Sequence, residues 1–220
     1  MSALSRRALL AGISGTTVAA CEERRPNSAT YVLLDVSGSY FRELSKATTA
    51  IRTLMAGLRA HDSFAVAEIG ACSFTDEAVI LRVTVPDRPS ERQRVILAAA
   101  QRLAHYASRV KATTYTDIRG ALTQAAQYLT QRPAERRSIV VFSDFEEDLP
   151  ANCRRDTALP SQLKGMQVIA TNVTRLPEDN REPARYQRRL DAWRRAVEAA
   201  GARWTLLPET ADLVAELAPR

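Results

Sequence analysis

Three oxygen-bearing side chains stand at alternate positions near the start of the chain: Asp35, Ser37 and Ser39. They follow a continuously apolar run, 31–34, which is typical of a strand buried on both faces of a parallel sheet. In such sheets the turn after a strand is where ligands bind. A carboxylate and two hydroxyls are hard oxygen donors, which suit Mg²⁺ and not zinc. The alternative is that they only cap the helix expected from Phe41.

Two further polar segments stand where the same sheet edge would bring them. Thr116 and Asp117 follow a polar loop and begin a helical pattern. Asp144 comes directly after Ser143, where the apolar run 138–142 ends. If the two apolar strands are parallel, their carboxyl ends meet at one edge of the sheet, and we expect these side chains to gather there.

Strands and helices alternate along the chain. The expected strands are 31–34, 63–69, 78–85, 138–142, 166–173 and 204–207. Apolar residues at helical spacing predict helices between most of them. This order predicts an α/β fold with a doubly wound, mostly parallel sheet and helices on both faces. The short link between the second and third strands favours a hairpin, which makes the third an antiparallel edge strand.

With these segments in this order, the chain resembles a von Willebrand factor type A (VWA) domain, a Rossmann-like fold, over residues 30–218. The resemblance implies a metal-ion-dependent adhesion site, and five residues match its ligand positions: Asp35, Ser37, Ser39, Thr116 and Asp144. Two departures stand beside them. Thr114 occurs where the family often has glycine, so it is a rival ligand, and Phe145 replaces a glycine that often follows the last aspartate.

The resemblance also implies what the site does. It would hold Mg²⁺, or another divalent cation such as Mn²⁺, with one coordination position open. In the family, that position takes an acidic side chain, Glu or Asp, of a protein partner. Such a site binds and does not transform, so we do not expect an enzyme.

The rival function is a metal-assisted hydrolase or phosphotransfer enzyme on a doubly wound sheet. It would need a base near a nucleophile such as Ser143. The only two histidines, His61 and His105, stand away from the expected strand ends. A phosphotransfer site around Asp35 would normally carry a second acid two positions on, and Ser37 stands there.

The N-terminus has the features of an export signal. Arg6 and Arg7 precede a mildly apolar stretch, 8–20, that is too short to span a bilayer. The paired arginines resemble the twin-arginine type of signal. The stretch ends in Val-Ala-Ala before Cys21, which resembles the lipobox of bacterial lipoproteins. We therefore predict a signal peptide over 1–20 and a lipid on Cys21. The alternative is an ordinary signal with an incidental cysteine.

These features predict a domain anchored to a membrane of the bacterial cell envelope, with 21–29 as lipidated cysteine and tether. The formal net charge of the chain is +6, which permits an anionic partner. Aromatic residues are few and do not alternate with basic ones, so we expect no nucleic acid. Arginines repeat along the late helical segment, 181–195, which is typical of a solvated face. The alternative for that helix is contact with anionic lipid head groups.

Two cysteines remain besides Cys21. Cys72 follows the second expected strand, and Cys153 follows the strand that ends before Asp144. In the family's usual strand order, those two strands flank the first one, so the cysteines could meet on the metal side. Exported proteins keep disulfides. Two free thiols fit the sequence equally well.

Overall fold

The structure is a computed structural model that describes residues 27–73, 76–151, 153 and 158–218. The expected signal peptide and Cys21 lie outside the described residues. The strands are β1 (Ser28–Asp35), β2 (Ser63–Ile69), β3 (Val79–Thr84), β4 (Arg136–Phe142), β5 (Gln167–Thr171) and β6 (Arg203–Leu207). The α-helices are α1 (Leu44–Ala56), α2 (Pro89–Ala107), α3 (Ile118–Thr130), α4 (Pro177–Arg181), α5 (Pro183–Ala199) and α6 (Asp212–Leu217). Short 3-10 turns are η1 (Phe41–Glu43), η2 (Asp76–Ala78) and η3 (Ser161–Leu163).

The six strands form one sheet in the order β3-β2-β1-β4-β5-β6. All neighbouring strands are parallel except β2 and β3, which pair antiparallel. The predicted doubly wound sheet with one antiparallel edge strand is therefore confirmed. Because β2 and β4 flank β1, the strand order also matches the one that the resemblance implied.

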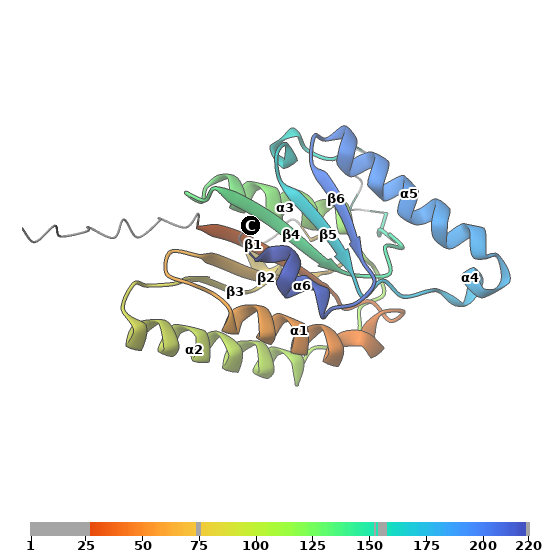
Figure 1. Cartoon of the computed structure of the whole chain (residues 1–220). Coiled ribbons are helices and arrows are strands. Elements are labelled where there is room, and N and C mark those ends of the chain that lie inside the picture. The colour runs from red at the N-terminus through yellow and green to blue at the C-terminus, as the bar shows by residue number, and fades with distance from the viewer. Residues whose placement is uncertain (1–26, 74–75, 152, 154–157, 219–220) are drawn as a thin grey trace, which may run out of the picture.

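Alternate residues of the central strands enter two separate cores. Tyr31 and Leu33 of β1 pack with α3 and α5 on one face of the sheet. Val32 and Leu34 pack with α1, α2 and α6 on the other face. Figure 1 shows α1 and α2 together below the sheet, with α3 and α5 on its opposite face. Burial on both faces explains why the strand is apolar without interruption.

The register aligns the carboxyl ends of the central strands. Asp35 of β1 lies opposite Ile69 of β2, and Leu34 lies opposite Phe142 of β4. The turns that leave these strands therefore start at one edge of the sheet. No helix among the described residues is long and apolar enough to cross a membrane.

Candidate metal centre

Asp35, the last residue of β1, is fully buried at the carboxyl edge of the sheet. Its Oδ1 accepts a hydrogen bond from the backbone N–H of Ser37 at 2.8 Å, and its Oδ2 accepts one from the Ser143 hydroxyl at 2.6 Å. Burial raises the pKa of Asp35 to about 6, although both hydrogen bonds act in the opposite direction. A nearby cation would favour the charged form of this carboxylate.

The two serines lie on the turn that follows. The hydroxyls of Ser37 and Ser39 are 3.1 Å apart, and Ser37 is buried while Ser39 is exposed. Tyr40, the next residue of this turn, is fully buried, and its hydroxyl donates a hydrogen bond to the carbonyl of Asn172 at 2.9 Å. This bond fixes the turn to the loop after β5. The serine hydroxyls are therefore held close together at the end of β1.

The three threonines of the loop before α3 differ in burial and in backbone pairing. Thr116 is buried, and its backbone pairs with that of Asp148, with the N–H of Thr116 2.7 Å from the Asp148 carbonyl. Thr113 pairs through its backbone with the turn at Ser37. Thr114, the rival ligand, is exposed. The loop thus touches both the turn after β1 and the loop after β4.

Asp117 does not begin the helix as the sequence suggested but caps it. Its Oδ1 accepts from the backbone N–H of Gly120 at 2.8 Å, and its Oδ2 accepts from the N–H of Ser73 at 2.9 Å. The first helical residue is Ile118. A side chain at Gly120 would collide with the Asp117 carboxylate, which explains the glycine in this turn. Asp117 thus ties the start of α3 to the turn that follows β2.

Asp144 supplies the second carboxylate of the site. It is fully buried, and its Oδ1 accepts from the backbone N–H of Glu146 at 2.9 Å. Its Oδ2 is also buried but has no hydrogen-bond partner. A buried carboxylate oxygen without a partner is costly unless an ion or water binds it. With Asp35 and the hydroxyls nearby, the donors fit a hard divalent cation.

Ser143 and Phe145 support the aspartates in a way that the sequence did not reveal. The Oγ of Ser143 also accepts from the backbone N–H of Phe145 at 2.9 Å. Phe145 has a φ of 61°, a conformation that bulky residues rarely adopt. Its ring is buried against Trp193 and Trp204, at centroid distances of 5.8 and 5.4 Å, and its carbonyl accepts from Trp193 Nε1. Aromatic packing thus compensates for the missing glycine.

Arginines of α5 fix the backbone around Asp144. Arg189 Nε donates to the Asp144 carbonyl at 3.0 Å, and its two terminal nitrogens hold Asp179 at 3.0 and 2.6 Å. The side chain of Arg189 is only 7% exposed, so the predicted solvated face does not include it. Arg185 binds Glu146 at 2.9 Å. The loop 143–148, which carries Asp144, is therefore positioned by α5.

A residue of α3 also binds the loop that follows Asp144. Arg119 donates to Glu147 through its backbone N–H at 2.9 Å and also forms an ion pair with it. Its guanidinium lies 4.5 Å from the ring centroid of Trp193. The two glutamates that follow Asp144 are thus neutralised by arginines, while Asp148 beyond them is exposed.

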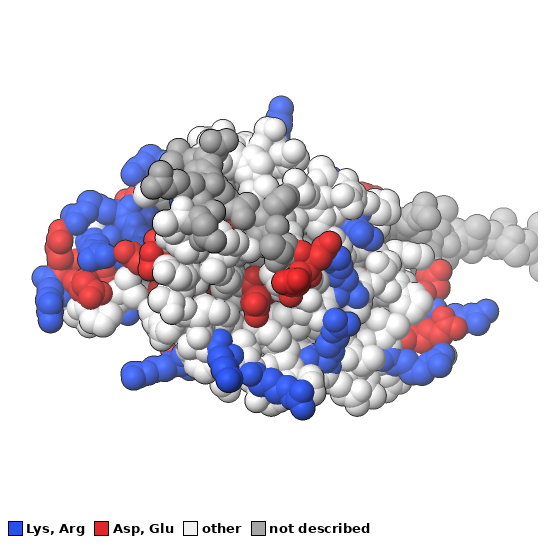
Figure 2. All heavy atoms as spheres, turned by 180° about the vertical axis from the view of Figure 1, so that it is seen from behind, with Lys and Arg blue, Asp and Glu red and all other residues white. Residues whose placement is uncertain are grey.

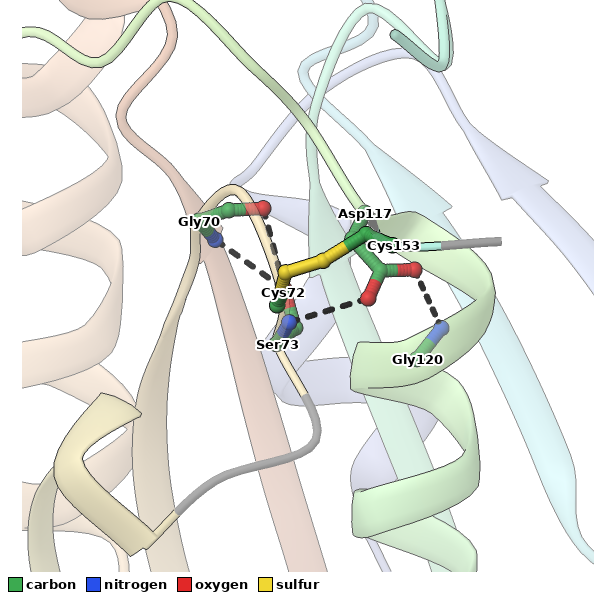
Figure 3. Close-up of a disulfide and its surroundings, with 6 residues drawn as sticks. All are labelled: Gly70, Cys72, Ser73, Asp117, Gly120 and Cys153. Atoms are coloured by element: carbon green, nitrogen blue, oxygen red, sulfur yellow. Dashed lines mark hydrogen bonds between the residues drawn. A yellow bond between two sulfur atoms is a disulfide. The ribbon is translucent and has the colours of Figure 1, made fainter. Parts of the chain in front are cut away.

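A disulfide joins Cys72 and Cys153, whose Cα atoms are 5.9 Å apart (Figure 3). Figure 3 shows the bond beside Ser73 and the Asp117 cap of α3. It therefore links the turn after β2 to the loop that follows the metal aspartate. Both turns leave the sheet at the edge that carries Asp35.

The family of the chain is shown by a family model for the von Willebrand factor type A domain, which matches residues 30–147. The chain belongs to this family, whose members are mostly interaction and adhesion modules rather than enzymes. No curated protein matches the chain.

Solved structures share the fold at low sequence identity. BatB from Bacteroides thetaiotaomicron matches with a TM-score of 0.55 and 16% identity, covering 87% of this chain and 97% of that one. The pilus adhesin SpaC from Lactobacillus rhamnosus GG matches at 0.54 and 11%, covering 89% of this chain and 29% of that one. A von Willebrand factor type A protein from Catenulispora acidiphila matches at 0.50 and 16%, covering 87% and 41%. The chain spans less than half the length of SpaC and of the Catenulispora acidiphila protein.

The donor set itself is unlike that of a zinc site. Within the described part of the chain, no three histidine, cysteine or acidic side chains gather closely enough to hold a metal. Two carboxylates and several hydroxyls are what the carboxyl edge of the sheet offers. A cation there would be bound by oxygen alone, with hydroxyls and water completing the set.

Proposed function

We propose that this domain binds a protein partner through a divalent cation held by Asp35, Ser37, Ser39, Thr116 and Asp144. The observation that carries the proposal is the buried, unpartnered Oδ2 of Asp144. It is aligned with the first carboxylate by the register of β1 and β4. Family membership supports the proposal, because VWA domains are mostly interaction modules.

The charges favour an acidic ligand on the partner. Two carboxylates neutralise a divalent cation, and hydroxyls add donors without adding charge. An open position on this hard cation then suits a carboxylate oxygen of Glu or Asp, and the site carries no excess negative charge that would repel it. Mg²⁺ fits this set of oxygens, and Mn²⁺ accepts similar ligands.

An enzymatic role has less support. His61 pairs with Asp87 at 2.7 Å before β2, at the opposite edge of the sheet from Asp35. His105 is exposed on α2. Neither histidine can act as the base for Ser143, whose hydroxyl is directed to Asp35.

We also propose that the chain is exported and anchored through a lipid on Cys21. Strand β1 begins at Ser28 and ends at Asp35, so the tether and the metal centre lie at opposite ends of one strand. At about 3.3 Å per residue, β1 separates them by roughly 23 Å. The anchor would thus leave the metal centre open to a partner.

Calorimetric titration with Mg²⁺ tests the metal site. Wild type should bind, Asp144→Ala and Asp35→Ala should not, and Asp148→Ala, which removes an exposed acid of the same loop, should bind as wild type does. Capture of an envelope protein should then need Mg²⁺, fail with chelator and fail with Asp144→Ala. Unchanged Mg²⁺ affinity in both site variants would refute the proposal. Mass spectrometry of the mature N-terminus tests the lipid separately.

A further inference from the structure

The layer formed by α1 and α2 carries an unusually one-sided charge. Figure 2 shows lysine and arginine side chains spread along the lower edge of the molecule, over these two helices. We call six exposed residues the basic face: Lys46, Arg52, Arg94, Arg102, Arg109 and Lys111. Helix α1 contains no Asp or Glu, and the one acid of α2, Glu91 in its first turn, pairs with Arg88. The charge of this layer is therefore not balanced locally.

The six side chains also have no partner in the part of the chain that the structure describes. No ion pair or side-chain hydrogen bond joins any of them to another residue that the structure describes. The arginines of α5 differ, since Arg185, Arg188, Arg189 and Arg194 each bind an acidic side chain. Helix α5, for which lipid contact was the alternative to a solvated face, is thus largely neutralised. The six residues of the basic face carry positive charge that no described acidic side chain pairs with.

Two basic residues of α2 lie on one side of the helix, and a third follows its end. Arg94 and Arg102 are eight residues apart, so they fall about 80° from one another around the helix axis, and Arg109 stands in the turn after Ala107. Leu97, 57% exposed, stands one turn after Arg94. Cations on one side of a helix, with an exposed leucine beside them, are what an interfacial helix presents to a bilayer.

We propose that the basic face docks on an anionic lipid bilayer. Charge complementarity carries the proposal, because phospholipid head groups attract lysine and arginine near the surface. Contact of the basic face with a bilayer rests on the proposed lipid anchor. Cys21 is six residues from Asn27, the first described residue, so the lipid can be at most about 20 Å away. A domain held so close meets the membrane with the surface that complements it.

This docking fixes how the metal centre is presented. The helices α1 and α2 cover a face of the sheet, whereas Asp35 and Asp144 lie at its carboxyl edge. With the basic face on the bilayer, that edge opens sideways, parallel to the membrane. The acidic group of the partner would then be bound close to the same membrane surface.

Vesicle co-sedimentation tests the docking without the anchor. The full chain carrying Cys21→Ser, kept in chelator, is mixed with phosphatidylcholine vesicles with or without phosphatidylglycerol. The test variant is Arg94→Gln, Arg102→Gln and Arg109→Gln together. The matched control is Arg181→Gln, Arg188→Gln and Arg195→Gln, which removes the same charge from exposed residues of α4 and α5. Both keep the same N-terminal residues.

The parent chain should bind vesicles that contain phosphatidylglycerol and lose binding as salt rises. The test variant should bind on the order of a hundredfold more weakly, at about fivefold for each charge, and the control should lose far less. Equal losses in the two variants, or no preference for the anionic lipid, would overturn the proposal. So would a stronger preference for heparin, which would assign the face to a soluble polyanion. Mg²⁺ titration and N-terminal mass spectrometry are unaffected by either result, so the proposed function fails or stands separately.

Discussion

The hydroxyl of Ser143 donates a hydrogen bond to Oδ2 of Asp35 across 2.6 Å, and so joins the ends of two adjacent strands. The same oxygen accepts from the backbone of Phe145, the residue after the second carboxylate. One buried hydroxyl therefore ties Asp35 to the turn that carries Asp144. Both carboxylates are held in place by the protein before any cation binds.

Removal of Asp144 should have opposite effects with and without metal. In chelator, Asp144→Ala should be between unchanged and about 2 kcal/mol more stable than wild type, because it removes a buried oxygen that has no partner. In Mg²⁺ at about 100 times its dissociation constant, wild type should gain about 2.7 kcal/mol and the variant nothing. Urea denaturation in the two buffers measures this, with Asp148→Ala as the control that should respond as wild type does.

The choice between two threonines can be tested directly. Thr116 is buried and paired with Asp148, whereas Thr114 is exposed. We expect Thr116→Ala to weaken Mg²⁺ binding about tenfold, the effect of losing about 1.4 kcal/mol. Thr114→Ala should change it little. Calorimetry decides, and the reverse order would identify Thr114 as the ligand.

Phe145 offers a test of backbone strain against packing. Truncation of its buried ring should cost about 3–5 kcal/mol in unfolding free energy. Because φ is 61°, Phe145→Gly should be about 1 kcal/mol more stable than Phe145→Ala, although glycine is the weaker residue at ordinary positions. Denaturant titration of the two variants compares them. A less stable glycine variant would show that no strain is stored there.

The disulfide should contribute strongly to stability. It links residues 81 positions apart, and closure of a loop of that length stabilises by about 4 kcal/mol in the chain-entropy estimate. Reductant should lower the unfolding free energy of wild type by that order, and Cys72→Ser with Cys153→Ser should match the reduced protein. The double variant itself should not respond to reductant. A response there would mean that reductant acts on something else.

The buried pair of Asp179 and Arg189 should make stability depend on pH. The Arg189 guanidinium holds the pKa of Asp179 below its usual range. A carboxyl whose folded pKa is lowered stabilises above its unfolded pKa, near 4, and loses that contribution as pH falls through the folded value. Asp179→Asn should therefore cost about 3 kcal/mol at pH 7, and the difference should shrink below pH 4.

A matched control lies close to this pair in the sequence. Glu182 and Arg188 form an ion pair in which both side chains are well exposed. Glu182→Gln should change the unfolding free energy by less than about 1 kcal/mol at any pH. If the two variants behave alike, Asp179 is not the anchor of the loop.

The sequence was sufficient for the strands and for the edge on which polar residues meet. Apolar runs such as 138–142 end directly at the aspartates, and this pattern depends only on local burial. Strand order could not be obtained in that way, because pairing joins distant segments. It came from the resemblance to a family.

The supports of the site were beyond prediction for the same reason. Arg189 stands among many arginines of one amphipathic helix, and nothing in its spacing separates it from Arg188, which is exposed. Its burial results from contacts with Asp144 and Asp179, 45 and 10 residues away. Phe145 was noted as a departure, but its two tryptophan neighbours could not be inferred from the chain.

The placement of the disulfide bears on the order of events in maturation. The bond joins two turns at the rim, whereas the strands before them are already aligned by pairing with β1. The domain can thus assemble in a reducing compartment and be oxidised afterwards, without rearrangement of its sheet. If the chain is exported in the folded state, its covalent structure would be completed only after it has crossed the membrane.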